Sequence, residues 1–404
     1  MPSQTPACVE TPNDPQFGLL DLIPERVKDV DCALTGARLN LVIPTIARQT
    51  RSFGGPATAI RLFERLTPEF DFARIVVTHE MESEVDSSDW PGWIMDRGVV
   101  ARRTMAFLGN KTAPLAVAPS DFFIATFWST AVYVKHIVRR QRLISRDANR
   151  RFVYLVQEYE PAFYPGGARY EYAKSTYRDD GTVIPVFNSR PVTNYFRDCG
   201  LLFSEQYEFE PMFHPQLLQW KADIGELAKE RLILVYGRPG FEQNGFDLIV
   251  EALRVWAHSY TRADEWSLVS AGLPHADVLL RGEIVLRSVG TLSLDQYALT
   301  LRRCWVGLSF AFNASTSYSA REMAEFGAWV VTNQFEYRKL SELPPSVICV
   351  DESTPEAVAE RLAWCCEQYQ PGQMAAVANL PPVFKREGDE FPFVNDLMTS
   401  WRKT

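Results

Sequence analysis

Short apolar runs alternate with amphipathic stretches along the first half of the chain. Leu39–Thr45 is almost continuously apolar, which is typical of a strand buried on both faces of a sheet. A glycine-containing loop follows, and Pro56–Leu66 then places its apolar residues on one face of a helix. Further strands are predicted at Ala73–Thr78, Asp121–Trp128, Phe152–Gln157 and Val183–Asn188, and helices at Ser129–Leu143 and Arg190–Asp198. This alternation predicts a doubly wound parallel sheet.

A second alternation of the same kind begins at residue 231, after a linker and a helix within Pro211–Glu230. Its predicted strands are Arg231–Tyr236, Ser267–Ala271, Val285–Val289, Val306–Phe310, Trp329–Thr332 and Val347–Val350, and its helices are Phe246–Tyr260, Asp295–Arg303, Ser319–Phe326 and Pro355–Tyr369. Ligands of such sheets bind outside the carboxyl ends of the strands. We therefore expect an α/β enzyme with two Rossmann-like domains that face a cleft.

The 404 residues divide into four predicted segments, because a chain of this length exceeds one compact core. Residues 1–37 form an N-terminal extension with a short helix near Leu20–Val30, and residues 38–212 form the N-terminal Rossmann-like domain. Residues 213–384 form the C-terminal Rossmann-like domain. Residues 385–404 form a helix that returns to the N-terminal domain.

Charge is distributed unevenly along the chain. The net charge is −8, yet residues 101–151 carry ten basic side chains against two acidic ones. Such a run is usually a solvated face, and the alternative is a surface that meets anionic lipid through Lys135–Arg151. The acidic balance and the lack of a recognition motif argue against nucleic acid as a partner.

The sequence shows no apolar run of about 18 residues and no basic-then-apolar leader at its start. Seven cysteines without zinc spacing suggest reduced thiols, so a cytoplasmic protein is expected, with the inner leaflet as a peripheral site. Dinucleotide fingerprints, P-loops, HExxH and GxSxG motifs are absent from the sequence. We predict neither a cofactor nor a metal, including at Asp29-Val-Asp31.

Two segments of the second domain are suited to binding an anion. Ser315–Ala324 leads from a predicted strand into a helix, where free backbone N–H groups and the helix dipole attract a diphosphate. Glu322 lies one turn inside that helix, and a simple capped amphipathic helix is the alternative interpretation. Arg238 follows Gly237 at the end of another strand, where its guanidinium can bind phosphate oxygens in pairs. Both segments belong to one predicted sheet and would share an edge.

The order of several short motifs resembles that of glycosyltransferase family 4, the retaining GT-B enzymes. It is most similar to bacterial rhamnosyltransferases of the WsaF type, which build rhamnan and S-layer glycans from dTDP-L-rhamnose. The segments that carry the resemblance are Val42–Thr45, Phe53–Gly55, Gln157–Pro161, Ala173–Tyr177, Val186–Ser189, Tyr207–Pro211, Tyr236–Pro239, Ser317–Ser319 and Glu322–Gly327. They span roughly residues 39 to 335 and imply a GT-B fold. The resemblance also implies that residues 38–212 bind the acceptor and residues 213–384 bind the nucleotide sugar.

The resemblance also implies a donor site. Arg238 and Gly237 would meet the diphosphate together with Ser317, Tyr318 and Ser319, whereas Glu322 would accept a hydrogen bond from a nucleotide sugar hydroxyl. The remaining implied donor contacts are Gly54, Gly55, Gly290, Thr291 and Leu292. Two departures stand out. Ala314 replaces the first of the paired glutamates of family 4, and Gln243–Gly245 lies where a lysine often follows.

On the acceptor side, Glu158 and Glu160 follow a predicted strand, and we expect them to act with Arg238 in catalysis. The predicted acceptor contacts are aromatic, because flat rings suit the apolar faces of sugars: Phe53, Trp128, Tyr159 and Tyr164. The expected reaction is sugar transfer from dTDP-L-rhamnose, with retention, to a glycan acceptor, which would be lipid-linked if the basic segment meets a membrane. Alternatives are a UDP- or GDP-hexose donor, a non-catalytic glycan-binding protein, and sugar-nucleotide epimerase chemistry.

Overall fold

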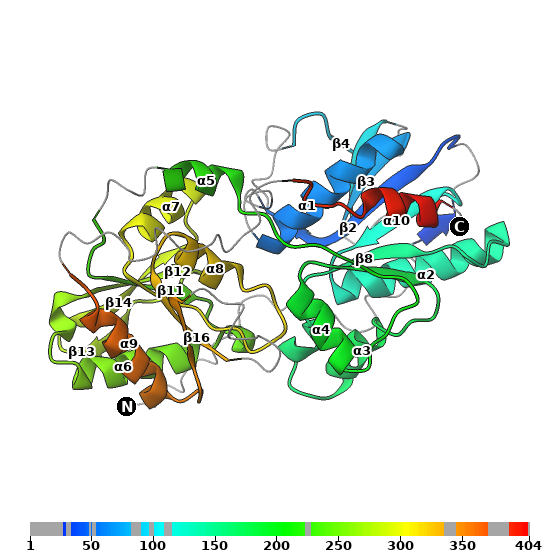
Figure 1. Cartoon of the computed structure of the whole chain (residues 1–404). Helices are drawn as coiled ribbons and strands as arrows, with labels where there is room; N and C mark the ends of the chain where they lie inside the picture. Colours follow the sequence, from blue (N-terminus) through cyan, green and yellow to red (C-terminus); the bar gives the residue numbers. More distant parts are fainter. Residues whose placement is uncertain are drawn as a thin grey trace, which may run out of the picture.

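The protein has two α/β domains that lie side by side, each with helices on both faces of a central sheet (Figure 1). The computed structural model describes residues 27–29, 34–47, 50, 54–81, 90–96, 101–108, 115–222, 228–334, 345–370 and 388–402. The chain completes the N-terminal sheet before it enters the C-terminal one, and its last helix, red in Figure 1, lies on the N-terminal domain.

The N-terminal sheet has eight strands in the order β10-β9-β8-β7-β2-β3-β5-β4, and every neighbouring pair is parallel. Their bounds are β2 (Arg38–Ile46), β3 (Phe72–Met81), β4 (Ile94–Met95), β5 (Arg103–Phe107), β7 (Asp121–Ala125), β8 (Phe152–Val156), β9 (Val183–Phe187) and β10 (Tyr207–Glu208). A separate parallel pair joins β1 (Val27–Asp29) to β6 (Leu115–Val117). Strands β7, β8 and β9 are buried throughout, which explains their continuous apolar runs.

Two hydrophobic layers sandwich this sheet. One layer contains side chains of α1 (Gly54–Leu66) and α10 (Val394–Trp401), and the other contains those of α2 (Trp128–Ser145) and α4 (Arg190–Asp198). Alternate residues of β2 divide between the layers, since Leu41 and Ile43 face the first and Val42 faces the second. The remaining helices are α3 (Ala168–Ser175), η3 (Thr67–Glu69) and η4 (Glu160–Phe163).

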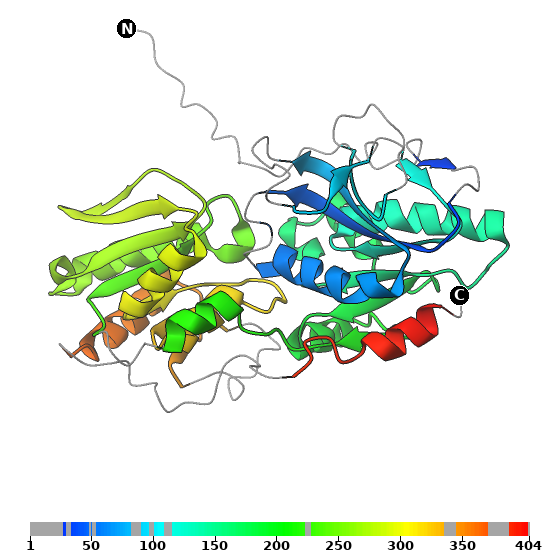
Figure 2. The same ribbon diagram turned by 90° about the horizontal axis from the view of Figure 1, so that it is seen from above.

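Helix α10 is anchored on the N-terminal sheet by its final turn. Trp401 is fully buried, its ring packs edge-on against Phe70 and Phe122, and its indole N–H donates to the Arg151 carbonyl at 2.9 Å. Just before the helix, Glu390 accepts two hydrogen bonds of 2.8 Å from Arg61 on α1. Figure 2 shows α10 beside α1 on the same side of the domain.

The C-terminal sheet has seven strands in the order β13-β14-β12-β11-β15-β16-β17. All neighbours are parallel except the edge strand β13, which forms an antiparallel hairpin with β14. The bounds are β11 (Leu232–Gly237), β12 (Ser267–Gly272), β13 (Val278–Arg281), β14 (Ile284–Gly290), β15 (Val306–Leu308), β16 (Trp329–Asn333) and β17 (Val347–Val350).

Helices α6 (Phe246–Ser259) and α9 (Pro355–Glu367) pack on one face of the C-terminal sheet. The other face is covered by α5 (Pro215–Ala222), α7 (Leu294–Arg303) and α8 (Tyr318–Glu325). Two short helical turns, η6 (Glu242–Asn244) and η7 (Ala263–Glu265), flank α6.

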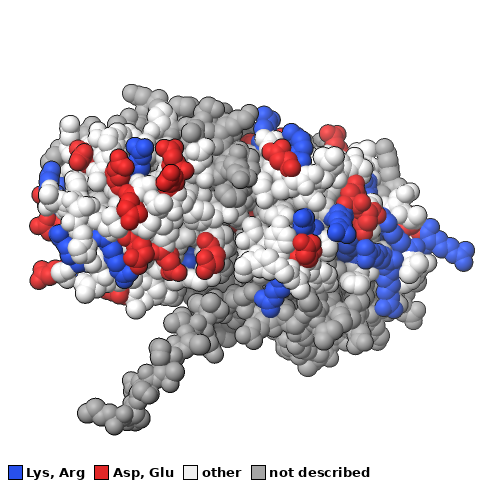
Figure 3. All heavy atoms as spheres, turned by 90° about the horizontal axis from the view of Figure 1, so that it is seen from below, with Lys and Arg blue, Asp and Glu red and all other residues white. Residues whose placement is uncertain are grey.

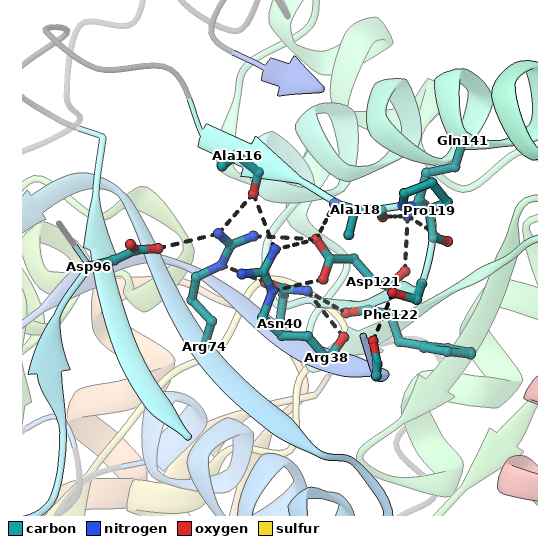
Figure 4. Close-up of polar contacts among 12 residues, drawn as sticks. Arg38, Asn40, Arg74, Asp96, Ala116, Ala118, Pro119, Asp121, Phe122 and Gln141 are labelled. Carbon is teal, nitrogen blue, oxygen red and sulfur yellow. Dashed lines mark hydrogen bonds and ion pairs between the residues drawn. The ribbon is translucent and has the colours of Figure 1, made fainter. Parts of the chain in front are cut away.

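A buried polar network ties together the amino ends of β2, β3 and β7 (Figure 4). The Asp121 carboxylate accepts two hydrogen bonds of 2.7 Å from Arg38 and lies 3.6 Å from the guanidinium of the fully buried Arg74. Arg74 also donates to Asn40 and, at 2.9 Å, to the Ala116 carbonyl on β6. The network therefore links the β1–β6 pair to the main sheet.

Several expected elements differ from the observed ones. Within the predicted helix Leu20–Val30, residues Val27–Asp29 form strand β1, and the residues before them lie outside the described range. The predicted strand Asp121–Trp128 ends at Ala125, and Trp128 already begins α2. Strands β4, β5, β10 and β13 were not predicted, because they are short or expose charged side chains and lack a continuous apolar run.

Candidate functional site

The carboxyl ends of β11, β12, β14 and β15 form one edge of the C-terminal sheet, and most predicted donor contacts lie there. Gly237 ends β11, where a Cβ atom would lie 1.9 Å from the Ser270 hydroxyl oxygen on β12. That hydroxyl is held at 2.7 Å by His275, so this close approach requires glycine. The sequence Gly237-Arg238 therefore combines a tight strand contact with a cation at the sheet edge.

Arg238 is half-buried, and its guanidinium lies 4.0 Å from the centre of the Phe241 ring. Stacking on an aromatic face fixes the plane of the guanidinium and leaves its N–H groups available. Within the described part of the chain, no carboxylate pairs with this guanidinium. Arg238 is thus an oriented cation suited to an anionic ligand.

Strand β15, which leads to helix α8, is the neighbour of β11 in the sheet, so the start of α8 and Arg238 belong to the same sheet edge. Ser317 caps the helix in the left-handed conformation, with φ 52°, which few residues other than glycine adopt. Ser319 bonds through its hydroxyl to Ser309 at 2.7 Å and so fixes the start of the helix to the end of β15. The first N–H groups of a helix, here those of Tyr318 and Ser319, have no acceptor within it.

One turn further into α8, Glu322 accepts a hydrogen bond of 3.0 Å from the Tyr297 hydroxyl on α7. Burial removes water from the carboxylate and raises the pKa of Glu322 to about 7, although the Tyr297 hydrogen bond opposes this shift. Tyr297 donates to one oxygen of this carboxylate. Because α7 packs on the same sheet face as α8, the pair is held rigidly.

The predicted base-binding loop, Gly290-Thr-Leu292, leaves the end of β14. Gly290 has a φ of 63°, which glycine adopts without strain, and the Thr291 hydroxyl donates to the Gly272 carbonyl at 2.8 Å. Leu292 packs against the layer that contains α7 and α8. The structure therefore brings this loop to the same sheet edge as Arg238.

On the N-terminal domain, Gly54 and Gly55 begin α1. Gly54 has a φ of 48°, and a Cβ atom at Gly55 would lie 2.9 Å from the side chain of Gln157, which follows β8. From α1, the Thr58 hydroxyl lies 3.4 Å from the hydroxyl of Tyr318 on α8. The start of α1 thus contacts the other domain beside the predicted diphosphate site. Phe53 lies outside the described residues.

The loop between β15 and α8 crosses to the N-terminal domain and pairs with the end of β8. Glu158 and Ser315 form an antiparallel β-bridge, and the Tyr159 amide donates to the Ala314 carbonyl at 2.9 Å. The Asn313 side chain donates to the Glu158 carboxylate at 2.7 Å. We call Asn313–Ser315 the bridging loop. It leads directly into the residues predicted to bind the diphosphate.

Ala314 itself is fully buried within the N-terminal hydrophobic layer that contains Val156 and Tyr159. The position where family 4 enzymes carry their first paired glutamate therefore serves here as an interdomain packing contact.

Glu158 is half-buried where the two domains meet. Loss of water raises its pKa, while the hydrogen bond from Asn313 and the nearby Arg238 guanidinium oppose that increase. Glu158 from one domain and Arg238 from the other therefore influence each other across the interface. This arrangement brings together two of the three predicted catalytic residues.

Glu160, the third predicted catalytic residue, is only 3% exposed and caps α2. Its carboxylate accepts hydrogen bonds from the Trp128 amide at 2.5 Å and the Tyr154 hydroxyl at 2.7 Å. Burial raises the pKa of Glu160 to about 8 despite these hydrogen bonds. Glu160 therefore positions the start of α2 and has no open path to a substrate in this structure.

The predicted acceptor aromatics divide into buried and accessible rings. Trp128 and Tyr159 are 4% and 3% exposed, because Trp128 packs against Tyr164 and Tyr172 and Tyr159 packs within the layer beneath α4. Both side chains therefore pack within the hydrophobic layers of the N-terminal domain. Tyr164 is half-buried and accepts a hydrogen bond of 3.0 Å from the Trp128 indole.

Three residues of this site were not predicted from the sequence: Thr58, Tyr297 and Asn313. Their partners lie far away in the chain, and no local motif surrounds them. Asn313 directly precedes Ala314, so the departure from the paired-glutamate pattern is the one sequence feature that pointed to this loop.

Among the described residues, no three His, Cys, Asp or Glu side chains gather so that they could hold a metal ion.

Both domains of the chain match models of one protein family. The model of the WsaF N-terminal domain matches residues 38–190, and the model of the WsaF C-terminal domain matches residues 231–363. The chain belongs to the WsaF family. The matched residues include the bridging loop, the whole C-terminal sheet and the N-terminal sheet except β10, and the predicted resemblance to the WsaF type is confirmed.

A curated relative of this WsaF protein is the O-antigen biosynthesis protein RfbC of Myxococcus xanthus. The two are 30% identical over 254 residues, which is 61% of this chain and 18% of RfbC. The WsaF chain thus spans about a fifth of the length of this relative.

Solved structures similar to this WsaF protein include HepE of Anabaena in complex with UDP and glucose, with a TM-score of 0.54 and 12% identity over 90% of this chain and 97% of HepE. WaaG, a glycosyltransferase involved in lipopolysaccharide biosynthesis, has a TM-score of 0.52 and 13% identity over 82% and 92% of the two chains. At these sequence identities the similarity concerns the fold alone, and it confirms the predicted GT-B fold.

No helix in the described part of the chain is long and apolar enough to cross a bilayer.

Proposed function

We propose that this chain is a glycosyltransferase that transfers L-rhamnose from dTDP-L-rhamnose to a growing surface glycan. The observation that carries the proposal is Arg238, an oriented cation that forms no ion pair within 4.0 Å among the described residues, at the sheet edge that leads to α8. A diphosphate carries the opposite charge and the oxygen acceptors that such a site needs. Membership of the WsaF family supports this assignment.

In the proposed reaction the bond between the donor sugar and its diphosphate breaks, and a bond forms between that sugar carbon and an acceptor hydroxyl. The hydroxyl proton passes to the departing phosphate oxygen on the same face, so the anomeric configuration is retained. Arg238 and the N–H groups of Tyr318 and Ser319 stabilise the charge that develops on the diphosphate. Glu158, on the facing domain, orients the acceptor hydroxyl by accepting its hydrogen bond.

The remaining contacts are assigned by position. Glu322 accepts a hydrogen bond from the nucleotide sugar through the carboxylate oxygen to which Tyr297 does not donate. Gly54 and Gly55 allow the N-terminal backbone to approach the donor, and Gly290–Leu292 borders the base. Tyr164 is the acceptor contact retained in the proposal, and Glu160 acts by positioning α2.

One observation supports the proposed donor sugar, and another supports the proposed product. Ala314 provides no carboxylate to the transferred sugar and is packed into the other domain, which supports the dTDP-rhamnose branch over the paired-glutamate enzymes. The similarity to an O-antigen biosynthesis protein supports a surface polysaccharide as the product.

Calorimetric titration with dTDP, UDP and GDP tests the proposal. We expect dTDP to bind most tightly, and Arg238→Ala to weaken it about 10- to 100-fold, because a charge-assisted hydrogen bond contributes about 1.5–3 kcal/mol. Arg281→Ala is the matched control, since Arg281 is exposed on the edge strand β13, and it should bind dTDP like the wild type. Preference for UDP or GDP would contradict the donor assignment, and binding of none of the three would contradict the proposed function.

A further inference from the structure

Helix α2 ends in a pair of exposed aliphatic side chains. Most of the helix is buried as far as Gln141, but Leu143 and Ile144 beyond it are 82% and 52% exposed. Leu143 is the most exposed large apolar side chain in the described part of the chain. Figures 1 and 2 both show this end of α2 projecting from the N-terminal domain, on the side away from the C-terminal domain. Two adjacent aliphatic side chains on a projecting helix end are suited to an apolar partner.

Basic side chains surround this pair. Arg139, Arg140 and Arg146 are all exposed, and Figure 3 shows Lys and Arg atoms gathered over this end of the domain. Arg146 has no hydrogen-bond or ion-pair partner among the described residues. We call residues Arg139–Arg146 the α2 tip.

The rest of the predicted basic segment Lys135–Arg151 is engaged within the protein. Lys135 is buried and shares Asp180 with Arg139, at 3.1 and 2.9 Å. Arg150 is buried over the Phe122 ring, and Arg151 pairs with Glu205. The basic side chains of this segment that are exposed, Arg139, Arg140 and Arg146, all belong to the α2 tip.

We propose that the α2 tip docks on an anionic lipid bilayer, with Leu143 and Ile144 entering the apolar layer and the surrounding arginines contacting the headgroup phosphates. Neither feature suffices alone, because stable attachment of a peripheral protein takes a second signal in addition to a small apolar anchor. Each arginine near such a surface strengthens binding about fivefold. An acidic protein would match the charges but would leave the two projecting aliphatic side chains unexplained.

Docking at the tip has a consequence for the acceptor. Helix α2 has 18 residues, so its tip lies about 27 Å from its first residue, Trp128, at a rise of about 1.5 Å per residue. That first residue lies beside Glu160 at the carboxyl edge of the N-terminal sheet. A lipid-linked acceptor would therefore need an extended glycan to span this distance, which fits a growing polysaccharide.

Co-sedimentation with vesicles tests the docking surface on the full chain. Vesicles of phosphatidylcholine with about one third phosphatidylglycerol should bind the protein, whereas phosphatidylcholine alone should bind it at least about 25-fold more weakly. The double variant Leu143→Ser with Ile144→Ser should lower binding at least about 10-fold. Arg140→Gln with Arg146→Gln should lower it about 25-fold.

Matched controls are Leu279→Ser, an exposed leucine on β13 of the other domain, and Arg254→Gln on α6, and both should bind vesicles like the wild type. Absence of binding to the anionic vesicles, or binding unaffected by the tip variants, would overturn the proposal. Calorimetry with dTDP on the same proteins separates this test from that of the proposed function, because the tip variants leave the donor site intact.

Discussion

At the scale of single residues, burial moves the pKa of the Glu322 carboxyl group close to neutral pH. Its pKa is raised to about 7, and the carboxyl group is therefore largely protonated at pH 6 and largely ionised at pH 8. Only the ionised form offers the second oxygen as a strong acceptor to a donor hydroxyl. The affinity for the nucleotide sugar should consequently increase about 10-fold from pH 6 to pH 8.

Titration of Glu322→Gln across the same range checks this prediction. The variant should bind more weakly at pH 8 and show little pH dependence, because its amide does not titrate. Glu283→Gln, at an exposed position between β13 and β14, serves as the control and should retain the wild-type profile. A wild-type affinity that is flat from pH 6 to 8 would contradict the assigned role of Glu322.

At the scale of secondary-structure elements, the amino edge of the N-terminal sheet depends on one buried carboxylate. Asp121 binds Arg38, lies beside Arg74 and accepts the Ala118 amide at 2.9 Å. Burial, followed by the neighbouring Arg38 guanidinium, lowers the pKa of Arg74, and Asp121 is the main group that opposes this. Its removal would take the carboxylate partner from Arg38 and leave the buried Arg74 beside one carboxylate, Asp96 at 3.4 Å, where it now has two.

We expect Asp121→Asn to lower the free energy of unfolding by about 3–5 kcal/mol, the typical loss when one partner of a buried ion pair is removed. Urea denaturation measures this change. Asp351→Asn is the control, because Asp351 is exposed and lies 3.9 Å from Arg361, where a pair contributes about 0–1 kcal/mol. Equal stability of the two variants would show that the network does not hold the sheet edge.

At the scale of the whole molecule, the bridging loop joins the two domains next to both halves of the site. The bond from Asn313 to Glu158 is part of this junction. Asn313→Asp would place two carboxylates at hydrogen-bond distance, where they repel each other or must share a proton. We expect the domains to separate, with a larger radius of gyration in X-ray scattering and a lower kcat/KM. Asn149→Asp, in an exposed turn, should change neither quantity.

The sequence predicted the parts of this arrangement that depend on local pattern. Continuous apolar runs identified the buried strands, and parallel order brought Arg238 and Ser317–Ser319 to one sheet edge, as the structure has them. The contact made by the bridging loop could not be predicted from the sequence, because Asn313 and Glu158 are 155 positions apart and only folding brings them together. The burial of Trp128 and Tyr159 was not predicted either, because periodicity does not distinguish an aromatic ring in the core from one at a cleft.

Sugar transfer itself tests the central claim most directly. The protein would be incubated with dTDP-L-rhamnose and rhamnose-terminated oligosaccharides, and the product analysed by mass and by NMR of the new linkage. The account predicts a rhamnosylated product with the donor's anomeric configuration retained, formed about 10²- to 10³-fold more slowly by Arg238→Ala. Tight dTDP binding without any product from these acceptors, or a product formed equally well without Arg238, would contradict it.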